Sequence, residues 1–342
     1  MTADLALLAA DVEERAAEAA RTWHPQARLH GVRPLTGGVS SLTFLADVDG
    51  VPDDVSRVVL KVAPPGLEAV RNRDVLRQGR LMRALHGQPG VVVPPVFFEH
   101  PGVSLDRPPL VGMGFVTGDC VEPGLTRDRD PSLLSQVRDR ALDAARVLAA
   151  LHAVDPGAVG LGDEPVVPLA AEIDRWTRAF TTVPADLQGE YQRCADALHD
   201  SMPAALPPRV NHGDYRLGNT LCDGGRVTAV IDWEIWSVGD PRIDVTWLTF
   251  FTDEAFHPAA PSTEPTGIPP AAELLDAYRR AGGAGELPDL SWFEALTRYK
   301  EASATALLIK RGRKAGVLDD SLIRMEPALP LLLDQAHELM RR

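Results

Sequence analysis

Apolar residues follow a strand-like pattern in the first third of the chain and a helical pattern in most of the remainder. Four short runs before residue 118 alternate or are continuously apolar, which predicts strands at 42–45, 57–64, 93–98 and 109–116. Two helical stripes accompany them, over residues 3–22 and about 65–85. Beyond residue 118 the apolar spacing predicts helices at 133–152, 169–180, 184–202, 270–282, 290–312 and 318–341. This order of elements predicts an α+β protein with its sheet in the N-terminal part.

A polar loop at residues 212–219 interrupts the helical part. An apolar lead-in delivers a His-Gly-Asp sequence that ends at Asp214, and Asn219 follows five positions later. The turn at 223–225 predicts a hairpin that returns a second acid, Asp232, at the end of an apolar strand. Phosphoryl transfer uses such a set, because one carboxylate accepts the hydroxyl proton while an amide oxygen and another carboxylate hold Mg²⁺. Each residue alone is also a common turn former or helix cap, but the ordered set favours catalysis.

A Gly-Gly turn precedes this loop in the chain and leads into strands, one of which carries a lysine. The backbone amides of Gly37 and Gly38 can approach a phosphate closely, and Ser40 and Ser41 offer hydroxyl donors. Lys61 is the only lysine before residue 300 in a chain that otherwise uses arginine. A lone lysine in a strand can snorkel from a sheet edge. Its place after a glycine-rich turn instead favours contact with the phosphates of a nucleotide.

The spacing of Asp214, Asn219 and Asp232 resembles that of the protein-kinase catalytic loop and its metal-binding aspartate. With Gly213 in the loop and Asp-Trp-Glu after the hairpin, the chain resembles the aminoglycoside phosphotransferase family of the protein-kinase-like superfamily. This resemblance extends over roughly residues 30–340. It implies a two-lobed fold with a five-stranded antiparallel sheet and a helix in the N-lobe, and a mainly α-helical C-lobe. It also implies that ATP and Mg²⁺ bind between the lobes.

The same resemblance assigns roles by position. Asp214 is the implied catalytic base, Asn219 and Asp232 are the implied metal ligands, and Lys61 is the implied phosphate contact. Kinase-like folds also place a glutamate on the helix that follows the lysine strand, and this chain has Gln78 there. Two alternative partners for the lysine therefore stay open, Asp74 and Glu68. Without either of them, the phosphates alone would hold the lysine.

The strand at 109–116 ends at Thr117-Gly118, where a kinase-like chain crosses from one lobe to the other. The resemblance implies that the backbone near Phe115 and Val116 meets the adenine and that Met113 lines the pocket behind it. An ordinary core strand is the alternative interpretation of these residues. The expected domains are an N-lobe of residues 1–115 and a C-lobe of residues 116–342.

Charge and cysteine content narrow the classes of partner and compartment. The net charge of −13 arises almost wholly after residue 115, since residues 1–115 hold 13 acids and 12 bases and the rest holds 35 acids and 23 bases. This acidity argues against nucleic acid as a partner; it is typical of a solvated surface and would also suit a cationic substrate.

No run approaches the roughly 18 apolar residues of a membrane span. Three scattered cysteines and an acidic N-terminus predict a cytoplasmic protein without disulfides.

The C-terminal part resembles, more loosely, the phosphotransferases joined to acyl-CoA dehydrogenases, which act on hydroxyacyl-type metabolites. The segments that carry this likeness are 267–270, 275–278 and 292–300. We therefore expect an ATP- and Mg²⁺-dependent phosphotransferase with a small-molecule alcohol as acceptor, either aminoglycoside-like or hydroxyacyl-type. A basic cluster at 310–314 would either complement a helix end or bind a phosphate-bearing substrate. The alternatives are a catalytically silent, kinase-like nucleotide-binding protein and a metal hydrolase. The sequence leaves the acceptor, the choice of ATP or GTP, and the oligomeric state open.

Overall fold

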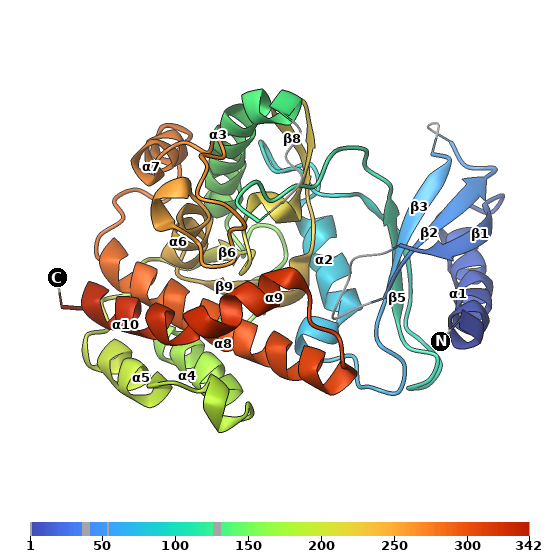
Figure 1. Cartoon of the computed structure of the whole chain (residues 1–342). Coiled ribbons are helices and arrows are strands. Elements are labelled where there is room, and N and C mark those ends of the chain that lie inside the picture. The colour runs from blue at the N-terminus through green and yellow to red at the C-terminus, as the bar shows by residue number, and fades with distance from the viewer. Residues whose placement is uncertain (1, 36–41, 53–54, 126–130, 342) are drawn as a thin grey trace. The chain divides into compact units, whose positions relative to one another are not determined.

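The computed structural model describes residues 2–35, 42–52, 55–125 and 131–341 (Figure 1). Four of the expected phosphate contacts, Gly37, Gly38, Ser40 and Ser41, lie outside the described residues. The chain forms two compact units. The first contains residues 1–118 together with 228–236, and the second contains residues 119–227 and 237–342. The separation at residue 118 coincides with the Thr117-Gly118 step singled out in the sequence, while the short return of 228–236 to the first unit is a tertiary feature.

The first unit is built on a five-stranded antiparallel sheet in the order β1-β2-β3-β5-β4. The elements are α1 (Thr2–Trp23), β1 (Arg28–Pro34), β2 (Leu42–Asp49), β3 (Arg57–Val62), the 3-10 helix η1 (Arg71–Arg73), α2 (Val75–Leu85), β4 (Val96–His100) and β5 (Leu110–Gly114). Helix α1 lies along the sheet (Figure 1). Its buried face, which includes Val12 and Ala16, joins Phe44 and Leu60 of the sheet in one apolar core. The predicted amphipathic helix and antiparallel sheet are confirmed.

Helix α2 begins ten residues later than the apolar pattern predicted, at Val75 instead of near residue 65. The preceding residues turn at Gly66, whose φ of 76° lies in the left-handed region. Asp74 caps the helix, because its side chain accepts a hydrogen bond from the amide of Arg77 at 3.0 Å. Gly79 then lets the helix approach β5 closely, since a Cβ there would lie 3.1 Å from Val111.

Residues 228–236 complete the first unit. The amide of Val230 donates to the carbonyl of Val92 at 2.8 Å, and Thr228 Oγ1 donates to the carbonyl of Thr117 at 3.2 Å. The segment ends in the short 3-10 helix η4 (Trp233–Ile235), where the side chain of Trp233 is buried. These contacts bring a piece of chain from beyond residue 200 beside the sheet.

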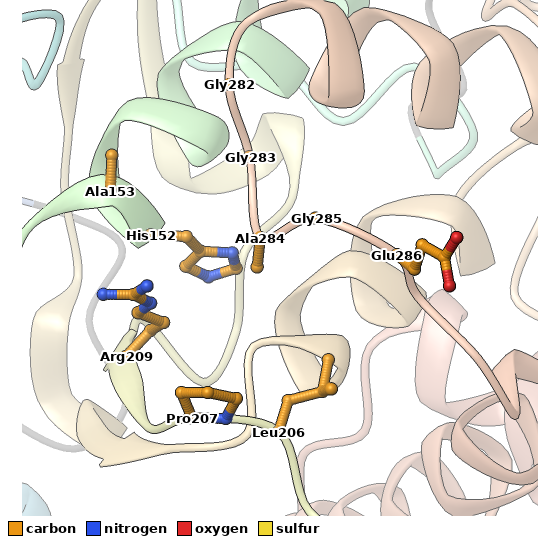
Figure 2. Close-up of a pocket in the computed structure, with 10 residues that line it drawn as sticks. All are labelled: His152, Ala153, Leu206, Pro207, Arg209, Gly282, Gly283, Ala284, Gly285 and Glu286. Carbon is orange, nitrogen blue, oxygen red and sulfur yellow. The ribbon is translucent and has the colours of Figure 1, made fainter.

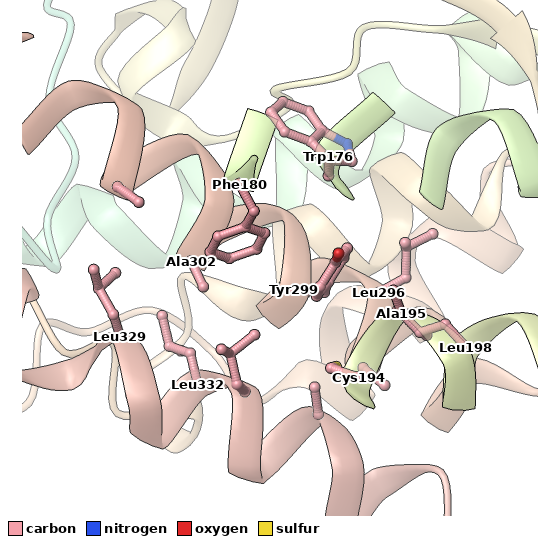
Figure 3. Close-up of a cluster of buried hydrophobic side chains, with 14 of the residues drawn as sticks. Trp176, Phe180, Cys194, Ala195, Leu198, Leu296, Tyr299, Ala302, Leu329 and Leu332 are labelled. Atoms are coloured by element: carbon pink, nitrogen blue, oxygen red, sulfur yellow. The ribbon is translucent and has the colours of Figure 1, made fainter. Parts of the chain in front are cut away.

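The second unit is mainly helical. Its described elements are α3 (Pro131–Ala153), α4 (Leu169–Phe180), η2 (Ala185–Leu187), α5 (Tyr191–Asp200), β6 (Arg209–Asn211), η3 (Leu217–Asn219), β7 (Thr220–Asp223), β9 (Ser237–Gly239), α6 (Arg242–Phe250), η5 (Asp253–Ala255), α7 (Ala271–Arg280), α8 (Leu290–Ala315), α9 (Asp320–Met325), η6 (Glu326–Ala328) and α10 (Leu329–Leu339). Strand β8 (Arg226–Val230) forms the predicted hairpin with β7 around Gly224. An apolar core joins α4, α5, α8 and α10, with Phe180 and Tyr299 buried near its centre (Figure 3).

The single helix predicted for residues 318–341 is wrong. The structure has α9 and α10 with the 3-10 turn η6 between them. Pro327 and Pro330 explain the interruption, because a proline lacks an amide donor and is tolerated only in the first turn of a helix. Within the described residues, no helix combines the length and apolarity that crossing a membrane requires.

Candidate active site

The polar loop, residues 212–219, lies between β6 and β7 in the second unit. Its backbone is anchored by Asp244 of α6, whose two carboxylate oxygens accept the amides of His212 at 2.6 Å and Gly213 at 2.8 Å. Gly213 has a φ of 86°, a conformation that favours glycine. Asp244 therefore fixes the backbone at the start of the polar loop.

Asp214 projects from this anchored backbone with both carboxylate oxygens engaged. Oδ1 accepts the indole Nε1–H of Trp247 at 2.6 Å and Nε–H of Arg216 at 3.3 Å. Oδ2 accepts the side-chain amide of Asn219 at 2.8 Å. The side chain of Asp214 is still 28 % exposed. The carboxylate is therefore held in one orientation and remains open to solvent, as a group that exchanges a proton with a small molecule must be.

Asn219 uses its side-chain nitrogen entirely within the loop. Nδ2 donates to the backbone carbonyl and to Oδ2 of Asp214, both at 2.8 Å. With the nitrogen directed at Asp214, the amide oxygen points to the other side. Hard cations such as Mg²⁺ prefer amide and carboxylate oxygens, and the role of Asn219 as a metal ligand stays a prediction.

A buried network behind the loop supports Asp244. His152, at the end of α3, lies with Nε2 3.7 Å from Asp244 Oδ2, and its Nδ1 bonds the hydroxyl of Tyr278 at 2.8 Å. Burial alone would raise the pKa of Asp244, but His152, His212 and the Gly213 amide outweigh it and hold that pKa below its ordinary value. The carboxylate is thus stabilised in its charged form. His152 thus supports Asp244 from the end of α3.

Lys300 of α8 is a positioning group that the sequence did not reveal. Its ammonium group is fully buried, donates to the carbonyl of Gly213 and lies 4.0 Å from the centre of the Trp247 ring. Burial lowers the pKa of Lys300, while the carboxylates of Glu172 and Asp214 oppose that change. A lysine among the apolar residues of a buried helix was the available signal.

Glu122 and Arg216 form a second support that sequence reasoning missed. Glu122 Oε2 accepts the amide of Gly218 at 2.9 Å and lies 3.5 Å from Arg216 Nη1. Burial raises the pKa of Glu122, although Arg216 and the Gly218 amide act in the opposite direction. Arg216 in turn contacts Asp214, so this pair connects the two ends of the polar loop.

Lys61 occupies the interior of β3 in the first unit, where its partners are acids from residues 228–236. Its Nζ lies 3.1 Å from Asp232 Oδ1 and 3.0 Å from Glu234 Oε1. Neither acid considered from sequence takes this place within the described chain, since Asp74 caps α2 and Glu68 is exposed. The partner that the sequence left open comes instead from a segment 171 residues further along the chain. Glu234 belongs to the Asp-Trp-Glu motif but had no role assigned.

Gln78, which stands where a kinase-like helix usually has glutamate, is buried and donates to the carbonyl of Asn72 at 3.2 Å. It therefore stabilises the segment before α2. Although Gln78 carries no charge, Lys61 still has a carboxylate partner, because Glu234 supplies it.

Asp232 has an unusual backbone conformation, with φ 65° and ψ 53° in the left-handed helical region. Residues other than glycine adopt this conformation at a cost, and such strain often marks functional positions. The side chain makes no capping hydrogen bond to η4, so the alternative role of a helix cap is not what the structure shows. With Oδ1 paired to Lys61 and 47 % of the side chain exposed, the carboxylate is accessible to a cation.

The three residues expected near adenine lie at the end of β5. Met113 is paired with Val59 of β3 and is only partly buried. Phe115 follows the last residue of the strand, and its ring stacks under the guanidinium of Arg57 at 4.1 Å. Val116 comes next, before the Thr117 carbonyl that Thr228 contacts. The structure shows where these residues lie, and their contact with a nucleotide stays a prediction.

A five-stranded antiparallel unit with a buried lysine, together with a helical unit that presents Asp214 and Asn219 on an anchored loop, defines the protein-kinase-like class of phosphotransferases. The model of the phosphotransferase enzyme family matches residues 31–296 of the chain. The chain belongs to this family.

Two curated relatives match parts of this chain. The probable acyl-CoA dehydrogenase IBR3 of Arabidopsis thaliana is 28 % identical over 61 % of this chain and 26 % of its own length. Acyl-CoA dehydrogenase family member 11 of Rattus norvegicus is 28 % identical over 71 % of this chain and 32 % of its own length. The chain thus spans about a third or less of these two relatives.

Two solved structures share the fold over nearly the whole chain. One is a protein from Ralstonia eutropha assigned to the aminoglycoside phosphotransferases, with a TM-score of 0.71 and 23 % identity over 95 % of this chain and 98 % of its own. The other is an aminoglycoside 2'-phosphotransferase-IIIa in complex with GDP, with a TM-score of 0.59 and 17 % identity over 95 % and 99 %.

Proposed function

We propose that this chain transfers the γ-phosphoryl group of ATP to a hydroxyl group of a small molecule, in a reaction that depends on Mg²⁺. The observation that carries the proposal is the arrangement around Asp214. Trp247 and Asn219 hold one carboxylate oxygen each, while Asp244 and Lys300 hold the backbone just before it. A base held in this way needs little reorganisation when the acceptor arrives.

Asp214 is the proposed base. Among the described residues, Oδ2 accepts a single hydrogen bond, from Asn219, so a lone pair remains for the proton of the acceptor hydroxyl. Hydrogen bonding to that lone pair orients the hydroxyl oxygen toward the phosphorus atom, and Asp214 takes the proton as the new P–O bond forms. Arg216, 3.3 Å from Oδ1, offsets the negative charge of the carboxylate before the transfer.

Asn219 and Asp232 are the proposed metal ligands, and Lys61 is the proposed contact to the phosphates. Mg²⁺, when bound, would neutralise charge on the phosphates during transfer. Asp232 offers a partly exposed carboxylate oxygen and Asn219 an amide oxygen, and both atom types match the ligand preference of this ion. Solved neighbours in complex with GDP, and with ADP and hygromycin B, support nucleotide use. Met113, Phe115 and Val116 remain the proposed neighbours of the adenine, by position on β5.

The acceptor is proposed only by class, as an alcohol of either the aminoglycoside or the hydroxyacyl type. The solved neighbours support the first class through their names, and the acyl-CoA dehydrogenase relatives support the second. In the structure, Asp214 is hydrogen-bonded by Trp247 and Arg216, and the guanidinium of Arg216 lies 5.5 Å from the centre of the Phe251 ring. The partly exposed guanidinium of Arg216 would suit an acceptor with an anionic group.

The proposal is tested by a screen for acceptor-dependent ADP release. The purified chain is given ATP or GTP with MgCl₂ and, in separate reactions, aminoglycosides, choline-like amines, sugars and hydroxyacyl-CoAs. Asp214→Asn is compared with Asp334→Asn, a matched change at an exposed aspartate of α10. We expect turnover with at least one alcohol, a loss of about 10²–10⁴-fold in kcat for Asp214→Asn, and full activity for Asp334→Asn.

Two outcomes would contradict the proposal. Turnover that survives Asp214→Asn unchanged would remove Asp214 as the base. Tight binding of a nucleotide without turnover toward any acceptor would instead support the catalytically silent, nucleotide-binding alternative.

A further inference from the structure

A cavity of about 410 Å³ lies in the second unit, at the C-terminal end of α3 (Figure 2). It is formed by three segments that are distant in sequence: the end of α3, the approach to β6, and the glycine-rich loop after α7. The lining residues are His152, Ala153, Leu206, Pro207, Arg209, Gly282, Gly283, Ala284, Gly285 and Glu286. Asp214 and its partners Trp247 and Asn219 are not among them, so the cavity is separate from the proposed base.

The wall formed by the glycine-rich loop is fixed by Tyr278. The amide of Ala284 donates to the Tyr278 hydroxyl at 2.9 Å, and the amide of Gly283 donates to the Tyr278 carbonyl at 3.1 Å. A Cβ at Gly283 would lie only 2.3 Å from the Tyr278 ring, so glycine is needed for this close approach. The loop is therefore held in place by specific contacts, and the cavity is a preformed feature of the fold.

Arg209 supplies the positive charge of the cavity. Across the described part of the chain, its side chain has no hydrogen-bond or ion-pair partner, although it is partly buried. Figure 2 shows the guanidinium beside His152 and Ala153, with Glu286 at the opposite end of the cavity. A guanidinium offers five donors in a planar fork that matches the oxygens of a carboxylate or a phosphate. An anionic group on a ligand would satisfy these donors.

His152 gives the cavity a second polar group. Its side chain is 1 % exposed, and within the described structure its Nε2 has no hydrogen-bond partner. The same nitrogen lies 3.7 Å from Asp244, which accepts the amides of His212 and Gly213 at the start of the polar loop. The cavity is thus one side chain away from the network that holds the loop.

We propose that this cavity binds a small molecule through an anionic group, a carboxylate or a phosphate, with Arg209 as the anchor. The volume lies in the lower part of the range of roughly 300–1,000 Å³ that small-molecule sites occupy, which suits a ligand of metabolite size. Leu206, Pro207 and Ala153 provide the apolar surface for the remainder of the ligand. This binding site goes beyond the proposed phosphotransfer and does not depend on it.

The proposal is tested by calorimetric titration of the full chain with two probes, inorganic phosphate and citrate. Arg209→Gln removes the anchor, and Ala153→Trp places a large side chain at the exposed end of α3, where it would fill the cavity. Arg311→Gln changes an exposed arginine elsewhere in the same unit, and Lys61→Met removes the proposed phosphate contact of the nucleotide site. Thermal unfolding of each variant verifies that it is folded.

We expect at least one probe to bind the wild type, Arg311→Gln and Lys61→Met alike. Binding should weaken by about tenfold or more in Arg209→Gln and disappear in Ala153→Trp. Binding that is lost in Lys61→Met and kept in Arg209→Gln would assign the anion to the first unit and overturn the proposal. Failure of both probes to bind the wild type at millimolar concentration would also overturn it. Because no turnover is measured, these outcomes are independent of the proposed function.

Discussion

Asn219 donates two hydrogen bonds to a single residue, one to the backbone carbonyl and one to the Oδ2 of Asp214. The separation of five positions is closed by the 3-10 turn η3, whose last residue is Asn219. Asp214, the expected base, and Asn219, an expected metal ligand, are therefore hydrogen-bonded to each other. A change at either residue disturbs the other.

Asn219→Ala should lower kcat by about 10²-fold and raise the Mg²⁺ concentration needed for half-maximal rate. The substitution removes both the group that orients Asp214 and the proposed ligand, and loss of a metal ligand's support alone typically costs about 10–100-fold. Steady-state kinetics across a Mg²⁺ titration measures both effects. An unchanged Mg²⁺ dependence would show that Asn219 acts only on Asp214.

Glu234→Gln should raise the KM for ATP several-fold, because Lys61 would lose the buried carboxylate that lies 3.0 Å from its Nζ. Asp74→Ala is the informative comparison, since Asp74 was one of the two acids considered from the sequence as a partner of Lys61. We expect it to leave the KM unchanged and to lower the free energy of unfolding by about 1 kcal/mol, the usual effect of losing a helix cap. A raised KM for ATP in Asp74→Ala and an unchanged KM in Glu234→Gln would contradict the pairing of Lys61 with Glu234.

Asp232→Gly should unfold at a higher denaturant concentration than Asp232→Ala, with a difference of about 1 kcal/mol in the free energy of unfolding. Both changes remove the carboxylate, but only glycine adopts the left-handed conformation at residue 232 without strain. Chemical denaturation of the two variants gives the difference directly. Equal stability would mean that the backbone strain at Asp232 is negligible.

Asp244→Asn should lower the free energy of unfolding by about 1.5–3 kcal/mol at neutral pH, because two backbone amides lose their charged acceptor. The pKa of Asp244 is held below 3.8, since His152 and the other groups around it outweigh the effect of burial. The carboxylate therefore contributes its full stability above pH 3.8, and that contribution is lost as the pH falls through the lowered, folded-state pKa. Denaturation curves from neutral pH down to about pH 3 should show the two proteins converging. A difference that stays constant on acidification would contradict the charged state of Asp244.

The boundaries of two helices differ from those expected from the sequence, and in each case the chain shows the cause. The apolar stripe continues back toward residue 65, but Gly66 and the cap at Asp74 delay α2 to Val75. The stripe of the last helix likewise runs through Pro327, and the chain turns there. The spacing of apolar residues shows which face of a segment is buried. It does not show where a helix begins or is interrupted, because a turn of the backbone can leave the same face buried.

The sequence by itself determined the sheet and helix content, the hairpin at 223–225 and the residue types proposed for phosphotransfer, because these depend on local spacing and side-chain type. Only the tertiary structure decided that Glu234 pairs with Lys61, that Lys300 and Trp247 position Asp214, and that Arg209 faces a cavity beside His152. These relationships join residues separated by tens of positions to more than a hundred. Which distant charges meet is settled by the packing of the whole unit, and no local pattern in the chain encodes it.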